Sequence, residues 1–130
     1  MSNIDTSTRP EIDFPDGNPP AELEITDIVE GTGPVVEPGD VIAVDYVGVS
    51  FSTGDEFDAS WNRGQALQFT AGKGQVIEGW DKGLLGMKVG GRRKLVIPAH
   101  QAYGDRSPSP LIKAGETLIF VCDLRAIQGK

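Results

Sequence analysis

The stretch YVGVSFSTGDEFDAS, residues 46–60, places an acidic side chain beside an aromatic one where the chain returns from a turn. Asp58 follows Phe57 directly, and Tyr46 opens the stretch. A buried phenol needs a hydrogen-bond partner, and Asp58 could serve Tyr46 in this way. The residue types leave two interpretations open. Asp58 belongs to a solvated turn, or it is a polar group that points into an apolar site.

Trp80 is the second residue with unusual neighbours, because it lies between Gly79 and Asp81. Its ring therefore lies beside a residue without a side chain. Like Tyr46 and Tyr103, it carries a polar group on an aromatic body, and such groups need partners when buried. The large side chains expected between helix and sheet are Tyr46, Phe57, Leu67, Phe69, Val76, Ile77, Trp80, Tyr103 and Phe120. In most small β proteins such a set is a plain core, whereas these details favour a ligand site.

The sequence shows no arrangement suited to covalent or metal chemistry. His100, the only histidine, follows Pro98 and Ala99 in an expected loop and is interpreted as exposed. Cys122, the only cysteine, lies in an apolar run and is interpreted as an inert core residue. A single cysteine excludes an internal disulfide, which fits a reducing compartment. We therefore expect neither a metal nor a cofactor.

Composition limits the expected partners and location. The formal net charge of −7 argues against nucleic acid, because phosphates require a basic surface. The basic run Arg92-Arg93-Lys94 is interpreted as a solvated strand end. No run approaches the ~18 apolar residues of a membrane span, so no membrane contact is expected. The N-terminal residues contain no apolar leader segment, and a cytoplasmic location is expected.

The chain is expected to divide into an acidic, proline-rich tail, residues 1–20, and one folded domain, residues 21–130. Ile12 and Phe14 are the candidates in the second half of the tail for contact with the domain. The acids and prolines of the tail are typical of solvated chain. Its deletion is therefore expected to leave the function of the domain largely intact.

Most of the domain has the hydrophobic pattern of strands. The segments concerned are ELEITDIVEG, VIAVDYVGVSF, GQALQFTAG, RRKLVIP and TLIFVCDLRAI. Alternation in the last segment predicts one apolar face, formed by Leu118, Phe120, Cys122, Leu124 and Ala126.

One segment, QVIEGWDKGLLGM, has helical periodicity instead. Apolar residues occupy the positions i, i+3, i+7 and i+10, namely Ile77, Trp80, Leu84 and Met87. Gly79 and Gly83 each cost about 1 kcal/mol in a helix interior, so the helix must be short and held by packing. Gly86 is a plausible end. One short helix can cover a sheet only if the sheet curls around it. The sequence therefore predicts an α+β fold, a curved antiparallel sheet of about five strands around one short α-helix.

Five motifs along the domain are DYVG, FDAS, GKGQVIEGWDKGLLGMKVGGRRKLVIP, AYG and TLIFVCDL. Together they resemble the FKBP-type peptidyl-prolyl cis-trans isomerases, in particular small single-domain members of bacterial type. The resemblance extends from about Leu23 to Ile127, and VIEGWDKGLLGMKVG is its most specific part. It implies a half-barrel sheet around the helix, with a substrate proline over the indole of Trp80.

The resemblance implies a role at each matching position. The catalytic residues would be Asp58, Tyr46, Tyr103 and Trp80, and the substrate-binding residues would be Phe57, Arg63, Leu67, Val76, Ile77, Leu111, Ile112 and Phe120. Tyr103 and the Ile112 amide would hydrogen-bond substrate carbonyls. Asp58 would stabilise the dipole of the twisted carbonyl or orient Tyr46. The alternative is a buried strut that only fixes the turn at Phe57.

Three positions depart from the pattern of the family. Leu67 stands where an aromatic residue is common, and so does Gln101, two residues before Tyr103. The flap GDRSPSPLIKAGE has Leu111 and Ile112 where a pair of isoleucines is typical, so the substrate preference of the family is not carried over to it.

The activity implied by the resemblance is X-Pro isomerisation in protein folding, by desolvating and twisting the amide in an apolar pocket. Its ligands would be proline-containing peptides, unfolded or client proteins, and macrolides of the FK506 or rapamycin type. The chain would act as a monomer. The alternative is a module that holds proline peptides or a macrolide in the same pocket without turnover. A structural β domain with a filled core is disfavoured by the glycine-flanked Trp80.

Overall fold

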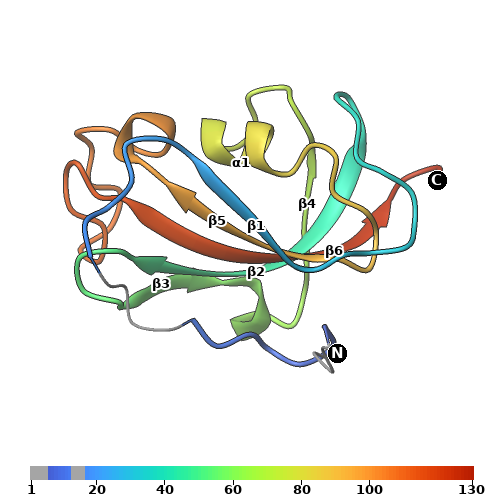
Figure 1. Ribbon diagram of the computed structural model, residues 1–130, viewed down its shortest axis with the longest axis horizontal. Helices are drawn as coiled ribbons and strands as arrows, with labels where there is room; N and C mark the ends of the chain where they lie inside the picture. Colours follow the sequence, from blue (N-terminus) through green and yellow to red (C-terminus); the bar gives the residue numbers. More distant parts are fainter. Residues whose placement is uncertain (1–5, 13–16) are drawn as a thin grey trace.

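The computed structural model describes residues 6–12 and 17–130, which form a curved sheet with one α-helix (Figure 1). The elements are β1 (Glu24–Val29), β2 (Val41–Ser50), β3 (Glu56–Ala59), the 3-10 turn η1 (Ser60–Asn62), β4 (Leu67–Thr70), α1 (Glu78–Gly83), β5 (Arg92–Ile97), the 3-10 turn η2 (Ala99–Gln101) and β6 (Leu118–Ile127). The predicted fold class is confirmed, with six strands in place of about five.

The sheet is antiparallel, and its strand order is β1-β5-β6-β2-β3, with β4 paired to β2. The two longest strands, β2 and β6, pair from Ile42–Ile127 to Ser50–Leu118. All five segments with strand patterning form strands. The return strand β3 pairs with β2 through a register shift between Gly48 and Val49, so it is bulged.

The main core lies between the concave face of the sheet and α1, which Figure 1 shows on one side of the strands. The predicted apolar face of β6 is correct from Leu118 to Leu124 and wrong at its end. Ile127 joins the core and Ala126 is exposed. The register of β6 against β2 shifts between Ala43 and Val44, and this shift moves the following residues of β6 to the opposite face.

Helix α1 is short, and its glycines face strand β5. A Cβ atom on Gly79 would lie 2.5 Å from the Ile97 side chain, and one on Gly83 would lie 2.8 Å from Leu95. The glycines therefore permit close approach of helix and sheet. The helix ends at Gly83, three residues before the predicted end at Gly86. Gly86 closes the turn that follows the helix and has a φ of +80°.

The two arginines of the basic run on β5 are buried, so the interpretation as a solvated strand end is wrong for them. The exposed fractions of Arg92 and Arg93 are 5% and 8%. Strand β5 lies between two strands that each supply a carboxylate. Arg92 pairs with Asp123 of β6, Nε to Oδ1 2.6 Å, and Arg93 pairs with Asp27 of β1, Nε to Oδ1 2.7 Å. Arg93 also donates to the carbonyl of Gly83 at the end of α1, at 2.8 Å.

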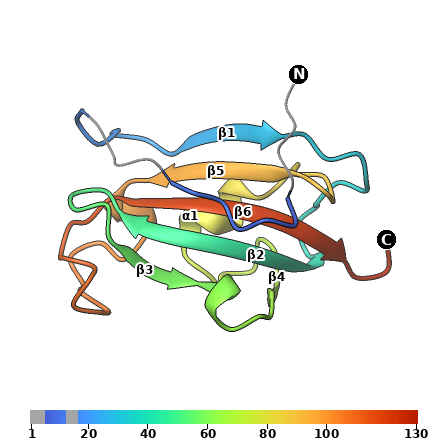
Figure 2. The ribbon, with the colours of Figure 1, turned by 90° about the horizontal axis from the view of Figure 1, so that it is seen from below.

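Residues 6–12, which we call the N-terminal strap, cross the outer face of the sheet, opposite α1 (Figure 2). Pro10 is buried, and Ile12 packs against the outer-face cluster of Val49, Val96 and Ile119. The interpretation as solvated chain is therefore wrong for Pro10, whereas Glu11 is exposed as expected. Phe14 lies outside the described residues, and the division at residue 20 stays a prediction. No helix among residues 6–12 and 17–130 is long and apolar enough to cross a membrane.

We predict that Gly79→Ala destabilises the protein, although alanine is the better helix former by about 1 kcal/mol. The added Cβ would overlap Ile97, and overpacking of this kind costs about 1–3 kcal/mol. Urea unfolding measures the net effect. Lys82→Ala is the control in the same helix, because the Lys82 side chain is 63% exposed. A gain in the free energy of unfolding for Gly79→Ala would contradict the close helix–sheet contact.

Candidate active site

A cavity of about 200 Å³ opens between α1 and the sheet. Its lining residues are Tyr46, Phe57, Asp58, Leu67, Gln75, Val76, Ile77, Trp80, Tyr103 and Phe120. All of these except Gln75 were predicted from the sequence. Three other predicted residues, Arg63, Leu111 and Ile112, are placed differently, and we describe them below.

Trp80 lies beneath the cavity with an exposed fraction of 4%. Its ring makes edge-on contacts with Tyr46 and Phe120, at centroid distances of 5.0 and 5.2 Å. Its Nε1 has no hydrogen-bond partner among the described residues. The short helix α1, held close to β5, thus supplies a rigid aromatic floor.

The wall opposite the helix depends on Gly48. Phe57 of β3 meets Phe120 of β6 edge-on, with ring centroids 5.4 Å apart. A Cβ atom on Gly48, which lies between them on β2, would be 2.6 Å from Phe57 and 2.7 Å from Phe120. Only glycine leaves room for this aromatic contact across β2.

The polar side of the cavity is a triangle of Tyr46, Asp58 and Arg63. The Tyr46 hydroxyl donates to Asp58 Oδ2. Arg63 donates from Nη1 to Asp58 Oδ1 and from Nη2 to the Tyr46 oxygen, both at 2.9 Å. Asp58 is therefore the partner of Tyr46 at an apolar site, and the interpretation as a solvated turn is set aside. Arg63 reaches the cavity through these two residues and does not line it.

Both tyrosines of the site keep their protons well above neutral pH. Burial, assisted by the hydrogen bond to Asp58, raises the pKa of Tyr46 to about 12. Burial and the charge of Asp58 raise the pKa of Tyr103 as well. Tyr103 is 36% exposed, and its hydroxyl makes no hydrogen bond to another of the described residues. It is thus a donor available at the cavity edge.

The flap places its two apolar residues differently from the expectation. Leu111 is 45% exposed, whereas Ile112 is buried in the core cluster and does not line the cavity. The Ile112 amide donates to the carbonyl of Ser109 at 3.0 Å. This tight turn already occupies the amide that the resemblance assigned to a substrate carbonyl. Ser50 ties the flap to β2 by donating to the Leu111 carbonyl.

Two residues that position the loop before α1 were missed in the sequence. The carboxylate of Asp81 accepts the amides of Gly72 and Gly74, at 2.9 and 2.8 Å. Gln75, which lines the cavity, accepts the Thr70 amide at 2.9 Å. Only the nearness of Gln75 to Val76 in the sequence could have indicated it.

The residues considered for other chemistry do not line the cavity. His100 is exposed, and Cys122 is buried in the core, where burial raises the pKa of its thiol. The described residues contain no group of three or more His, Cys, Asp or Glu side chains suited to a metal ion.

The curved sheet, the glycine-flanked tryptophan and the apolar cavity define a half-barrel protein that can enclose a small apolar group beside a phenol. A family model of FKBP-type peptidyl-prolyl cis-trans isomerases matches residues 33–125. The chain belongs to this family, as the sequence resemblance implied.

Individual relatives agree with this assignment. An FK506-binding protein of Streptomyces anulatus is 66% identical over 120 residues, which cover 92% of this chain and 97% of the relative. A probable FK506-binding protein of Corynebacterium glutamicum is 50% identical, with 89% and 96% covered. The crystal structure of AtFKBP13 has a TM-score of 0.75 at 39% identity and covers 81% of this chain and 92% of that one.

We predict a phenol titration near pH 12 in the variant Tyr103→Phe, which leaves Tyr46 as the only tyrosine. The raised pKa means that folding favours the protonated phenol. Its contribution to stability is complete below pH 10 and is lost as the pH rises from 10 towards 12. Ultraviolet absorbance of the phenolate in the folded and the urea-unfolded protein measures the shift. A folded midpoint at 10 would contradict the buried contact with Asp58.

Proposed function

We propose that this protein accelerates cis-trans isomerisation of X-Pro peptide bonds during protein folding. The observation that carries the proposal is the apolar cavity with a tryptophan floor and a single polar side. Membership of the isomerase family supports it. The cavity volume of about 200 Å³ suits a small ring such as that of proline.

The barrier to be lowered comes from the resonance of the amide, which costs about 18–20 kcal/mol to break by rotation. The isomers before proline lie close in energy but exchange over roughly tens to hundreds of seconds. Because resonance separates charge across the amide, an apolar cavity disfavours the planar ground state more than the twisted transition state. Removing about 6 kcal/mol in this way would accelerate the reaction on the order of 10⁴-fold.

The polar residues then act by orientation and local charge. The Tyr103 hydroxyl is a free donor at the cavity edge and would bind a substrate carbonyl. Asp58 would stabilise the dipole of the twisted carbonyl or hold Tyr46 in place, and its contacts with Tyr46 and Arg63 fit either role. The Ile112 amide joins in ligand binding only if its contact with Ser109 opens.

The names of the relatives support macrolide binding in the same cavity, because several of them are FK506-binding proteins. We therefore propose that FK506 or rapamycin competes with proline-containing peptides and client proteins. We also propose a monomer in the cytoplasm with no nucleic-acid or membrane partner. The net charge of −7 supports the exclusion of nucleic acid.

A protease-coupled assay with a short X-Pro peptide tests the activity. We expect turnover without added metal or nucleotide, unchanged by EDTA and inhibited by rapamycin. Binding of rapamycin without acceleration of the peptide would identify a binding module instead. Loss of activity in EDTA would contradict the desolvation mechanism.

Asp58→Ala should lower kcat/KM by about tenfold or more, equivalent to about 1.4 kcal/mol. The loss of unfolding free energy should be smaller, because the Asp58 side chain is 45% exposed. Asp55→Ala is the matched control, since Asp55 is an exposed acid of the preceding turn. Equal losses of activity and stability would favour the strut role of Asp58.

The residue before proline should preferably be apolar, with Leu-Pro peptides turned over at least about tenfold faster than Glu-Pro peptides in kcat/KM. We expect the side chain before proline to meet the exposed Leu111 and the ring of Phe57, which would form an apolar rim without a partner for a glutamate. Arg63 is already engaged by Asp58 and Tyr46. A peptide series varied at this position, assayed at low and high salt, measures the ratio. Equal rates at both salts would contradict the apolar rim.

A further inference from the structure

Strand β2 changes partners directly beside the active site. Along one edge it pairs with β4 from Val41 to Val44, and with β3 from Val47 onward. Asp45 and Tyr46 lie in the gap between the two partners. A backbone amide left unpaired at a gap of this kind costs free energy when it is buried, so the Tyr46 amide needs an acceptor from elsewhere.

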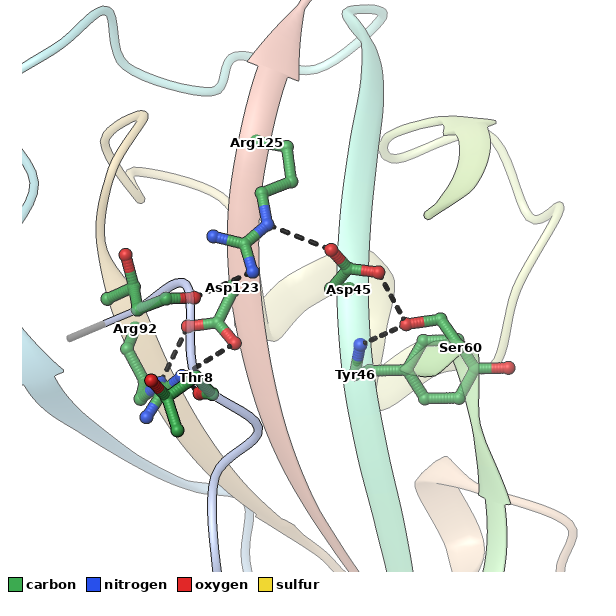
Figure 3. A network of polar contacts seen from close by, with 8 residues as sticks. Thr8, Asp45, Tyr46, Ser60, Arg92, Asp123 and Arg125 are labelled. Atoms are coloured by element: carbon green, nitrogen blue, oxygen red, sulfur yellow. Dashed lines mark hydrogen bonds and ion pairs between the residues drawn. The ribbon is translucent and has the colours of Figure 1, made fainter. Parts of the chain in front are cut away.

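The hydroxyl of Ser60 supplies this acceptor. Ser60 is fully buried and begins the turn η1 immediately after β3. Its Oγ accepts the Tyr46 amide at 2.8 Å and donates to Asp45 Oδ1 at 2.8 Å (Figure 3). The two adjacent residues of β2 are thereby bound to one side chain of η1, which replaces the missing ladder contact.

Ser60 lies in the segment that carries two of the three residues of the polar triangle. Asp58 lies in β3, shortly before Ser60, and Arg63 is the C-terminal cap of η1. Both bind the phenol of Tyr46, whose amide is held by Ser60. The position of η1 against β2 therefore sets where the carboxylate and the guanidinium meet the phenol.

The network continues across the outer face of the sheet to the N-terminal strap. Arg125 of β6 donates from Nε to Asp45 Oδ2 at 2.9 Å and from Nη2 to the Thr6 carbonyl at 2.7 Å. Its guanidinium also lies 5.4 Å from the ring centroid of Trp61, which follows Ser60. Figure 3 shows Arg125 reaching Asp45 from the neighbouring strand.

The strap holds the same turn from its other side. Arg9 donates from Nη1 to Asn62 Oδ1 at 2.8 Å, and Asn62 donates to Glu56 Oε2 at 3.1 Å. Arg9 also pairs directly with Glu56. These exposed contacts connect the strap to both ends of the segment that contains Asp58.

We propose that Ser60 and Asp45, braced by Arg125 and the N-terminal strap, are positioning residues that hold the Tyr46–Asp58–Arg63 triangle in its working geometry. The proposal rests on the proposed isomerase function for its activity readout. None of the bracing residues lines the cavity, so they act through Tyr46 and Asp58. On this proposal the strap contributes to activity, although deletion of the tail was expected from the sequence to leave the function largely intact.

A double-mutant cycle tests the proposal. Ser60→Ala should lower kcat/KM by about fivefold, because small displacements of positioned groups are costly in catalysis. In a Tyr46→Phe background the same change should cost less than about twofold, since coupled residues are not additive. Removal of residues 1–12 should give a loss similar to that of Ser60→Ala.

The matched control is Val36→Ala, a buried core residue that belongs neither to the cavity lining nor to the outer-face cluster contacted by Ile12 of the strap. It should lower the free energy of unfolding without changing kcat/KM at temperatures where the protein is folded. All variants are assayed there, with unfolding curves measured in parallel. Equal losses for Ser60→Ala in both backgrounds, or a neutral Tyr46→Phe, would overturn the proposal.

NMR of isotope-labelled tyrosine gives a second readout that does not depend on activity. Ser60→Ala and the removal of residues 1–12 should shift the ring signals of Tyr46 and leave those of Tyr103 in place. An inactive wild-type protein would contradict the proposed function alone. Unchanged Tyr46 signals in both variants would contradict the positioning role alone.

Discussion

The close approach of α1 to β5 sets the position of Trp80 beneath the cavity. A helix of six residues does not form by itself, so α1 exists only through its packing. Gly79 and Gly83 remove the side chains that would keep it away from Ile97 and Leu95. The glycines that weaken the helix are thus the ones that seat Trp80 against the rings of the sheet. Stability of the helix and position of the cavity floor cannot be separated in this design.

The opposite wall depends on the register between β2 and β6. Gly48 pairs with Phe120, so the one strand position without a side chain lies where Phe57 and Phe120 must meet. A slip of one residue would exchange the faces of every side chain along the strand. It would turn Tyr46 away from the cavity and carry its neighbour Asp45 into the core. The cavity is therefore a product of register as much as of residue type.

Much of this architecture could be predicted from the sequence, because periodicity shows which face of a segment is buried. All strands except β3, the short helix around Trp80 and the lining residues on α1 and β6 follow from that signal. Ala126 was misplaced because a bulge changes the face of a strand without any local mark in the sequence. Arg92 and Arg93 were judged by their own polarity, whereas their burial depends on carboxylates from distant strands. Ile12 of the strap was recognised as a candidate for contact, whereas Thr6 and Thr8 bind Arg125 and Arg92 through their carbonyl groups, which leave no side-chain pattern to read.

The charged outer face explains how one sheet can hold such a register. Asp123 is fully buried with Arg92, and burial raises the pKa of its carboxyl. Buried ion pairs add little net stability over apolar residues, but one left without its partner is strongly destabilising. Strand pairings that separate Arg92 from Asp123 are therefore penalised. The strap completes the arrangement, since the Thr8 carbonyl accepts from Arg92 at 2.6 Å. The ion pairs on the outer face thus select the strand pairing. The apolar face of the sheet is then free to form the walls of the cavity.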